Sequence, residues 1–162
     1  MTLRYVKVAL VAFISLLCLM YAAQNVANLQ AAHFFVSTAT SMAGHEAYPA
    51  SFGPGLGSPG LVWIALAIII AGEVAAGVVA ARGAWALWAA RGGTAEQFNG
   101  AKHLANLGGG LALLVWFGLF TVIGGAYFQM WQTELGAGSL GGAFQYVTQI
   151  GIVLLFVNLK DR

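Results

Sequence analysis

The residue best suited to chemistry is Glu73, an acidic side chain near the centre of a long apolar run. If that run spans a membrane, an unpaired charge at this depth costs about 2.5–3.5 kcal/mol, so the side chain is expected to have a functional or strongly structural role. We expect its carboxyl group to be protonated, or to hydrogen-bond to Asn106, Thr121 or Gln145 on a neighbouring helix. Proton transport requires a chain of ionisable groups, and this run holds one. We therefore favour a structural hydrogen-bonding role for Glu73 over proton or substrate handling.

The three histidines are the next candidates for a site. A membrane-bound b-type haem needs two imidazoles that face each other from spanning helices. His33 and His45 fall on one side of the predicted membrane and His103 falls on the other, so no two of them share an iron within this chain. His103 remains a weak candidate for cofactor binding. We expect interfacial histidines that hydrogen-bond to headgroups or loops, and no cofactor.

No motif for catalysis is present in the sequence. It contains no zinc-ligand spacing, phosphate loop, nucleophile elbow or carboxylate pair. The three glycines at residues 108–110 lie inside an apolar run, without the strand that a nucleotide loop requires. The single cysteine, Cys18, forms no internal disulfide, and packing is its expected role. We predict a protein that is not an enzyme, with no catalytic residue and no metal site.

Four long apolar runs set the fold class. Each can cross a hydrocarbon core of roughly 30 Å as a helix of about 20 residues. Unbroken apolar runs exclude a closed barrel, whose strands alternate between apolar and polar residues. We predict an all-α integral membrane four-helix bundle that forms one domain over residues 1–162. The predicted spans are at about 5–25, 61–84, 103–131 and 141–159.

The basic residues predict the orientation of these spans. All seven Lys and Arg lie in three segments that flank or separate the runs, and the connections at 24–60 and 132–142 contain none. By the positive-inside bias, both termini face the cytoplasm. The first run, which follows Arg4 and Lys7, is expected to be a retained anchor and not a cleaved signal peptide. The net charge of +2 without a basic stripe argues against nucleic acid as a partner.

The connections between the spans also carry local signals. Within the outer loop at 26–60, apolar residues recur at near-helical spacing between 26 and 43, which predicts a short interfacial helix. All three prolines then occur beside glycines, so regular structure should stop there. Thr94 and Gln97 match a capping box that begins the third helix. Gly138, Gly141 and Gly142 predict a short turn into the fourth helix.

Glycine is frequent, at 22 residues, and many of the glycines lie inside the predicted spans. Apolar helices gain nothing from the hydrophobic effect when they pair in lipid, so small residues that bring backbones together favour association. We favour packing within the bundle over contact with other subunits for these glycines. The residues expected to make structural or partner contacts are Glu73, Trp116, Gly124, Gly125, Trp131 and Gln132.

Three segments carry a pattern that covers much of the chain: FNGAK at 98–102, LVWFG at 114–118 and VIGGAYFQMWQ at 122–132. They resemble a bacterial family of small predicted integral membrane proteins, known as a domain of unknown function. The similarity continues through 35–36, 41–42, Glu73 and 143–144. It implies a four-span fold in the bacterial cytoplasmic (inner) membrane and supplies no activity.

The chain departs from the family pattern at several polar positions. Where the family commonly has an acid after the paired glycines and a base after the Ala-Phe of the fourth helix, this chain has Ala126 and Gln145. The outer helix has lost a basic or histidine pair and an acid, and carries Ser37, Thr38 and Ala43 instead. Such losses suit a paralogue recruited as a packing subunit.

Together these features predict a non-catalytic accessory subunit of a larger bacterial inner-membrane assembly, with a photosynthetic or respiratory electron-transfer complex as the expected host. It would pack against partner helices and shape a path for quinone or lipid. The expected partners are membrane lipids and other transmembrane subunits, with quinone as a further candidate. Two alternatives stay open. One is a membrane anchor subunit that binds haem, pigment or quinone, and the other is a small proton-linked transporter that uses Glu73.

Overall fold

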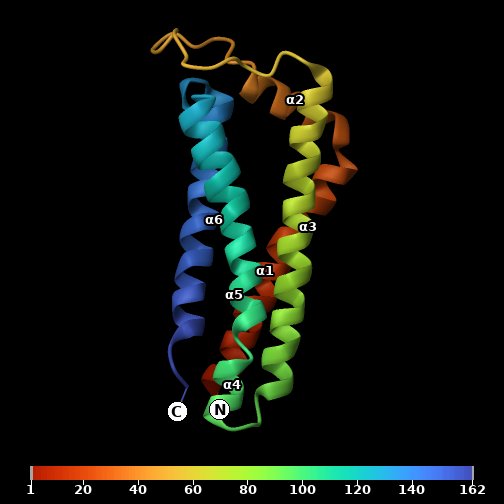
Figure 1. The fold of residues 1–162 in the computed structure, drawn as a ribbon, viewed down its shortest axis with the longest axis vertical. Helices are drawn as coiled ribbons and strands as arrows, with labels where there is room; N and C mark the ends of the chain where they lie inside the picture. Colours follow the sequence, from red (N-terminus) through yellow and green to blue (C-terminus); the bar gives the residue numbers. More distant parts are fainter. Residues whose placement is uncertain (1, 162) are drawn as a thin grey trace.

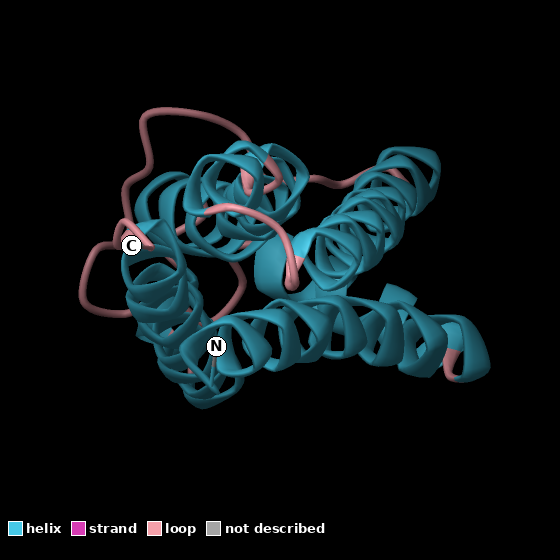
Figure 2. Cartoon of the chain, turned by 90° about the horizontal axis from the view of Figure 1, so that it is seen from below, coloured by secondary structure: helices cyan, strands magenta, loops and turns pink. Residues whose placement is uncertain are grey.

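The computed structural model describes residues 2–161, and within them the chain forms helices and loops without a strand (Figures 1 and 2). Four helices are long and apolar enough to cross a membrane. The prediction of an all-helical membrane bundle is confirmed. The spans are α1 (Thr2–Ala27), α3 (Pro59–Ala90), a third span that joins α4 (Ala95–Gly100), α5 (His103–Leu113) and η1 (Leu114–Tyr127), and α6 (Glu134–Asn158).

Both ends of the chain lie at the same end of the bundle, beside α4 (Figure 1). We call this the basic end, because Arg4, Lys7 and Lys102 form hydrogen bonds there with residues 91–93 and 159–161. The opposite end, called here the loop end, carries the irregular segment at 41–58. The capping box that begins the third span is present, with Gln97 N–H donating to Thr94 Oγ1 at 3.2 Å and Thr94 N–H donating to Gln97 Oε1 at 2.9 Å.

Near the basic end, α3 packs closely between α1 and α5. Glycine permits this approach, since a methyl group at Gly108 would lie 2.6 Å from Cα of Ala80, and one at Gly83 would lie 2.6 Å from Cα of Ala105. No L side chain fits between backbones at that separation. The predicted packing role within the bundle therefore applies to these glycines, whereas others, such as Gly110 and Gly141, face open space.

The short helix predicted between residues 26 and 43 is α2 (Leu29–Thr40), which crosses the loop end of the bundle (Figure 1). Its buried Val36 packs with Val62 and Leu66 of α3. The other side of α2 leaves Phe34 69% exposed. The helix therefore has one face on the bundle and an apolar side chain available to lipid, as an interfacial helix requires.

The third span changes character beyond Leu113. Through η1 it becomes a π-helix, in which each backbone N–H donates to the carbonyl five residues earlier. Phe128 N–H donates to the Ile123 carbonyl at 2.9 Å, and the Thr121 hydroxyl donates to the Trp116 carbonyl at 3.2 Å. Whereas α5 packs along α3, η1 packs mainly against α6. The two halves of the bundle therefore separate toward the loop end.

The predicted turn at Gly138, Gly141 and Gly142 is wrong, because all three glycines lie inside α6. The chain reverses earlier, at Gln129, whose φ of 49° places it in the left-handed region. A short 3₁₀ helix, η2 (Met130–Gln132), follows, and the Thr133 hydroxyl then caps α6 by accepting from Gly136 N–H at 3.1 Å. Glycine ends helices in water more readily than in a span, where every backbone group must be paired within the helix.

Candidate functional site

Glu73 lies at the middle of α3 and is 2% exposed. The amide nitrogen of Asn25, near the end of α1, donates to both of its carboxylate oxygens, at 3.2 Å to Oε1 and 2.9 Å to Oε2. A carboxylate offers about four lone-pair positions, so this one amide leaves acceptor capacity unused. The Glu73 carboxylate is therefore held in place and still able to accept further hydrogen bonds.

The partners predicted for Glu73 are wrong. Asn106 pairs with Asn158 through two amide hydrogen bonds of 2.9 and 2.8 Å. Thr121 donates to the backbone of its own helix, and Gln145 is exposed on α6. Asn25 was missed because its position was assigned to the outer end of the first span, at the beginning of the loop.

Three aromatic side chains stand next to this carboxylate. Trp116 is 2% exposed, and its ring centroid lies 6.0 Å from that of Tyr21 and 5.5 Å from that of Tyr146. The two tyrosine hydroxyls hydrogen-bond to each other. Trp116 was predicted as a structural or partner contact, and its place is at the centre of an aromatic group that joins α1, η1 and α6.

The aromatic group and Glu73 border a chamber of about 540 Å³. Its wall includes Asn25 and a second carboxylate, Glu134 at the beginning of α6. No Lys, Arg or His among the described residues lines it. The chamber thus presents hydrogen-bond acceptors and aromatic faces, without a cation to hold an anion.

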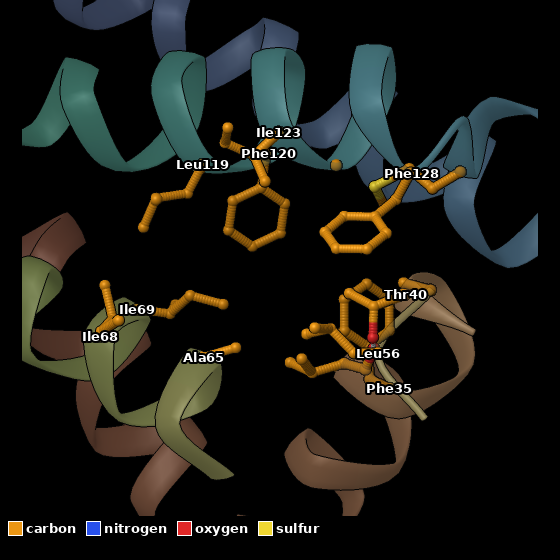
Figure 3. Close-up of a pocket in the computed structure, with 14 residues that line it drawn as sticks. Phe35, Thr40, Leu56, Ala65, Ile68, Ile69, Leu119, Phe120, Ile123 and Phe128 are labelled. Atoms are coloured by element: carbon orange, nitrogen blue, oxygen red, sulfur yellow. Dashed lines mark hydrogen bonds between the residues drawn. The ribbon is translucent and has the colours of Figure 1, made fainter. Parts of the chain in front are cut away.

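An apolar cavity of about 240 Å³ adjoins the chamber, between α2, α3 and η1 (Figure 3). Phe35 of α2 and Phe120 of η1 line both spaces. The only polar side chain in the wall is Thr40, whose hydroxyl donates to the Val36 carbonyl at 2.7 Å. Ile68 and Ile123 in the wall are 54% and 46% exposed, so the cavity reaches the lipid-facing surface between α3 and η1.

The remaining predicted contact residues lie around the loop end. The side-chain amide of Gln132 forms two hydrogen bonds with the backbone of Tyr48. It accepts from the Tyr48 N–H at 2.7 Å and donates to the Tyr48 carbonyl at 3.2 Å. Trp131 packs edge-on against the Tyr48 ring, with 5.5 Å between centroids. Gly124 lies against Met130 and borders the apolar cavity, and Gly125 faces Leu140 of α6. These residues join the loop and the end of the third span.

His103 and His33 lie at opposite ends of the bundle. His103 is exposed at the beginning of α5, near the basic end. His33 lies on α2 with its ring centroid 4.3 Å from that of Trp63, and its Nε2 is buried without a hydrogen-bond partner among residues 2–161. Within that range, no three His, Cys, Asp or Glu side chains are placed to share a metal ion.

The basic end holds a polar cluster that the sequence did not predict. Asp161 Oδ2 accepts from Lys7 Nζ at 2.6 Å and from Lys102 Nζ at 2.8 Å. Both ammonium groups also donate to the Leu159 carbonyl, and Asn99 Oδ1 accepts from Lys102 Nζ at 2.7 Å. Burial by itself would raise the pKa of Asp161, but the hydrogen bonds from Lys102 and Lys7 and their charges outweigh it and lower that pKa below 3.8. The only available signal was the occurrence of Asn99 and Lys102 in one family-like segment.

The model of a family described as predicted small integral membrane protein (DUF2165) matches residues 3–160. The chain belongs to this family. The match spans all four helices and confirms the resemblance carried by the segments around Asn99, Trp116 and Trp131. No curated protein and no solved structure matches the chain.

Within this DUF2165 chain, the two span positions expected to depart from the family's polar pattern are on the surface. Ala126 on η1 and Gln145 on α6 are both exposed. Neither residue borders the chamber or the apolar cavity. Both positions therefore lie outside the Glu73 site.

Proposed function

We propose that this chain is a non-catalytic accessory subunit that packs through α6 against other transmembrane helices of a larger assembly. The observation that carries the proposal is the exposure of Gln145 and Gln149 near the middle of α6. Neither side chain hydrogen-bonds to a residue within 2–161. A lipid tail cannot satisfy a primary amide, whereas a neighbouring helix can.

The two glutamines belong to one face of α6. At 100° per residue, Gly138, Gly141, Gln145, Gln149 and Ile152 all fall within about a quarter of the helix circumference, and all are exposed. A methyl group at Gly138 or Gly141 would meet nothing within 4 Å in this chain. Small residues beside polar ones are the usual composition of a contact between spanning helices. This face, residues 138, 141, 145, 149 and 152, is called the α6 face below.

Burial also distinguishes α6 from the other spans. Its most apolar stretch is 17% buried within the chain, against 28–33% for the other three. Ala76, Ala80 and Ala112 of α3 and α5 belong to one buried cluster, to which α6 contributes the buried residues Ala143 and Ile150. More of α6 is therefore free for a neighbour than of any other span.

We place the host among the respiratory and photosynthetic electron-transfer complexes of the bacterial inner membrane, which are assemblies of many spanning helices. The proposed orientation has both termini in the cytoplasm, because the basic end gathers the cationic residues. In this position the chain would contact membrane lipids and shape a path for quinone or lipid beside its cavities.

Two glycine variants test the proposal. Leucine at position 141 would block a partner helix, whereas leucine at 110 is the matched control, since both positions have open space for a side chain in this chain. We expect wild type and Gly110→Leu, extracted from the native membrane in a mild detergent, to migrate as one particle with the same subunits in fixed ratio. Gly141→Leu should migrate as the free chain.

A second variant, Gln145→Leu/Gln149→Leu, removes the amides without adding bulk and should also release the chain. Circular dichroism of each purified variant verifies that the helices are retained. Migration of the wild type solely as a free chain, or solely as a particle of identical copies, would contradict the proposal.

A further inference from the structure

We propose that the loop-side half of the bundle binds one quinol-type lipid, with its aromatic head in the Glu73 chamber and its isoprenoid tail in the adjoining apolar cavity. The inference deepens the part of the proposed function that concerns a quinone or lipid path. It stands on the cavities alone and needs no partner at the α6 face.

The chamber determines the charge of the head group. Glu73 and Glu134 both line it, and no basic side chain does. An anionic phosphate would face carboxylates with no cation to offset the repulsion. A neutral hydroxyl is accepted instead, because the Glu73 carboxylate is 98% buried and Asn25 occupies only part of its acceptor capacity.

The aromatic residues determine the shape of the head group. Trp116 and Tyr146 line the chamber, together with Tyr21. Their rings meet at interplanar angles between 55° and 74°, so they form a tilted wall and do not close the space by stacking flat on one another. A flat ring of the ligand can pack edge-to-face or offset against them. Hydroxyl donors on a flat aromatic ring describe a hydroquinone.

The apolar cavity accounts for the tail. It has a volume of about 240 Å³ and a wall that is apolar except for Thr40, so it suits a hydrocarbon segment. Phe35 and Phe120 line both spaces, so the tail space and the head space lie on either side of these two side chains. A ligand that occupies both spaces would pass between their rings. Ile68 and Ile123 mark where a tail would leave toward lipid. A branched hydrocarbon suits such a wall, because it fills irregular apolar space with no polar group to pair.

Binding can be measured with the purified chain in phosphatidylcholine nanodiscs. The probe is a ubiquinol with a two-isoprene tail, kept reduced without oxygen, and its oxidised quinone is the comparison. A ligand that binds the folded state raises the unfolding midpoint in a saturable manner, and native mass spectrometry gives its stoichiometry. We expect one quinol per chain, and weaker binding of the quinone, which has no hydroxyl to donate.

Variants locate the site. Ala65→Phe fills the apolar cavity and should abolish the quinol-dependent rise, while Ala71→Phe, on an exposed position of the same helix, should behave as wild type. Glu73→Gln keeps the side-chain volume and replaces one carboxyl oxygen by an amide donor, and should weaken quinol binding roughly fivefold or more. If Ala65→Phe does not fold, the Glu73→Gln comparison and the quinol-against-quinone difference still decide the question.

Three results would overturn the inference. The first is quinol binding that Ala65→Phe leaves intact, and the second is that quinol and quinone bind equally well, both to wild type and to Glu73→Gln. The third is loss of the bound probe when the phosphatidylcholine of the nanodisc is replaced by phosphatidylethanolamine. The last would identify a phospholipid occupant. Because Gly141→Leu lies outside both cavities, it should bind quinol as wild type does. Loss of association by that variant and loss of quinol binding by Ala65→Phe are thus separate outcomes.

Discussion

The side-chain amide of Asn25 bridges both carboxylate oxygens of Glu73 and so fastens the end of α1 to the middle of α3. These two bonds are the only hydrogen bonds between side chains of α1 and α3 within residues 2–161. A further link, from the Ser15 hydroxyl to the Gly77 carbonyl at 2.8 Å, lies about one turn nearer the basic end along α3 and nearly three turns along α1. Because a buried carboxyl group that loses its hydrogen-bond partner is costly, the two residues are energetically coupled.

The coupling predicts an asymmetry between single and double variants. Asn25→Leu leaves the Glu73 carboxyl group buried without its partner and should lower the free energy of unfolding by about 1–3 kcal/mol. Asn25→Leu/Glu73→Leu removes both polar groups and should cost less than the single change. Unfolding in mixed micelles measures both values. Asn28→Leu, at an exposed position on the same side of the loop end, is the control and should have little effect. Additive losses in the double variant would refute the coupling.

The Asp161 cluster predicts a dependence on pH. Because the folded pKa of Asp161 is lower than its usual 3.8, the carboxylate contributes stability that is fully present above that value and is lost as pH falls through the folded pKa. Asp161→Asn should cost roughly 1–3 kcal/mol at pH 7, between the values for exposed and buried ion pairs. The difference in unfolding free energy between wild type and variant should shrink in acid. Lys160→Gln, at an exposed neighbouring position, should match wild type throughout.

The contact between α3 and α5 predicts opposite effects for two glycines of one helix. Gly108→Ala places a methyl group against the backbone of Ala80 and should destabilise the bundle by about 1–3 kcal/mol. Gly110→Ala enters open space and should be neutral, or stabilising by up to about 1 kcal/mol, because alanine favours helix. Thermal unfolding followed by circular dichroism measures both. Equal effects at the two positions would show that helix propensity, and not backbone contact, governs this crossing.

The loop end offers a kinetic prediction. Gln132→Leu removes both hydrogen bonds to the Tyr48 backbone and should release the segment at 41–58 from the end of the third span. Limited proteolysis in that segment should then be about fivefold faster or more, since one net hydrogen bond contributes about 1 kcal/mol. Glu46→Gln, a change at an exposed loop position without a hydrogen bond to the spans, serves as the control. An unchanged cleavage rate in Gln132→Leu would show that these two hydrogen bonds do not hold the segment at 41–58 to the end of the third span.

The number of spans and the capping box at Thr94 could be predicted from sequence because both depend on local properties, namely hydropathy and the chemistry of one helical turn. The turn at Gly138 was predicted wrongly by the same kind of argument. Glycine frequency distinguishes helix from turn in water, but in a span glycine also serves close packing, so composition does not separate the two uses.

The Glu73 site could be predicted only in part. The apolar run around Glu73 identified this residue. Its partner, Asn25, depends on how far α1 extends and how it crosses α3, which no local pattern encodes. The two cavities depend on the departure of η1 from α3, and the Asp161 cluster joins positions as far apart as Lys7 and Asp161. Such relationships follow from the tertiary arrangement and have no counterpart in spacing along the chain.

The cluster at the basic end also imposes an order on biogenesis. Lys7 is translated before its acceptors, Leu159 and Asp161, which emerge from the ribosome only after all four spans. Until then α1 stays in the bilayer while the Lys7 ammonium group lacks its hydrogen-bond acceptors from the protein. A chain that is stalled or truncated before residue 159 therefore lacks the contact that joins α1 to the residues after α6. Surveillance proteases that recognise loosely closed bundles would find such chains first.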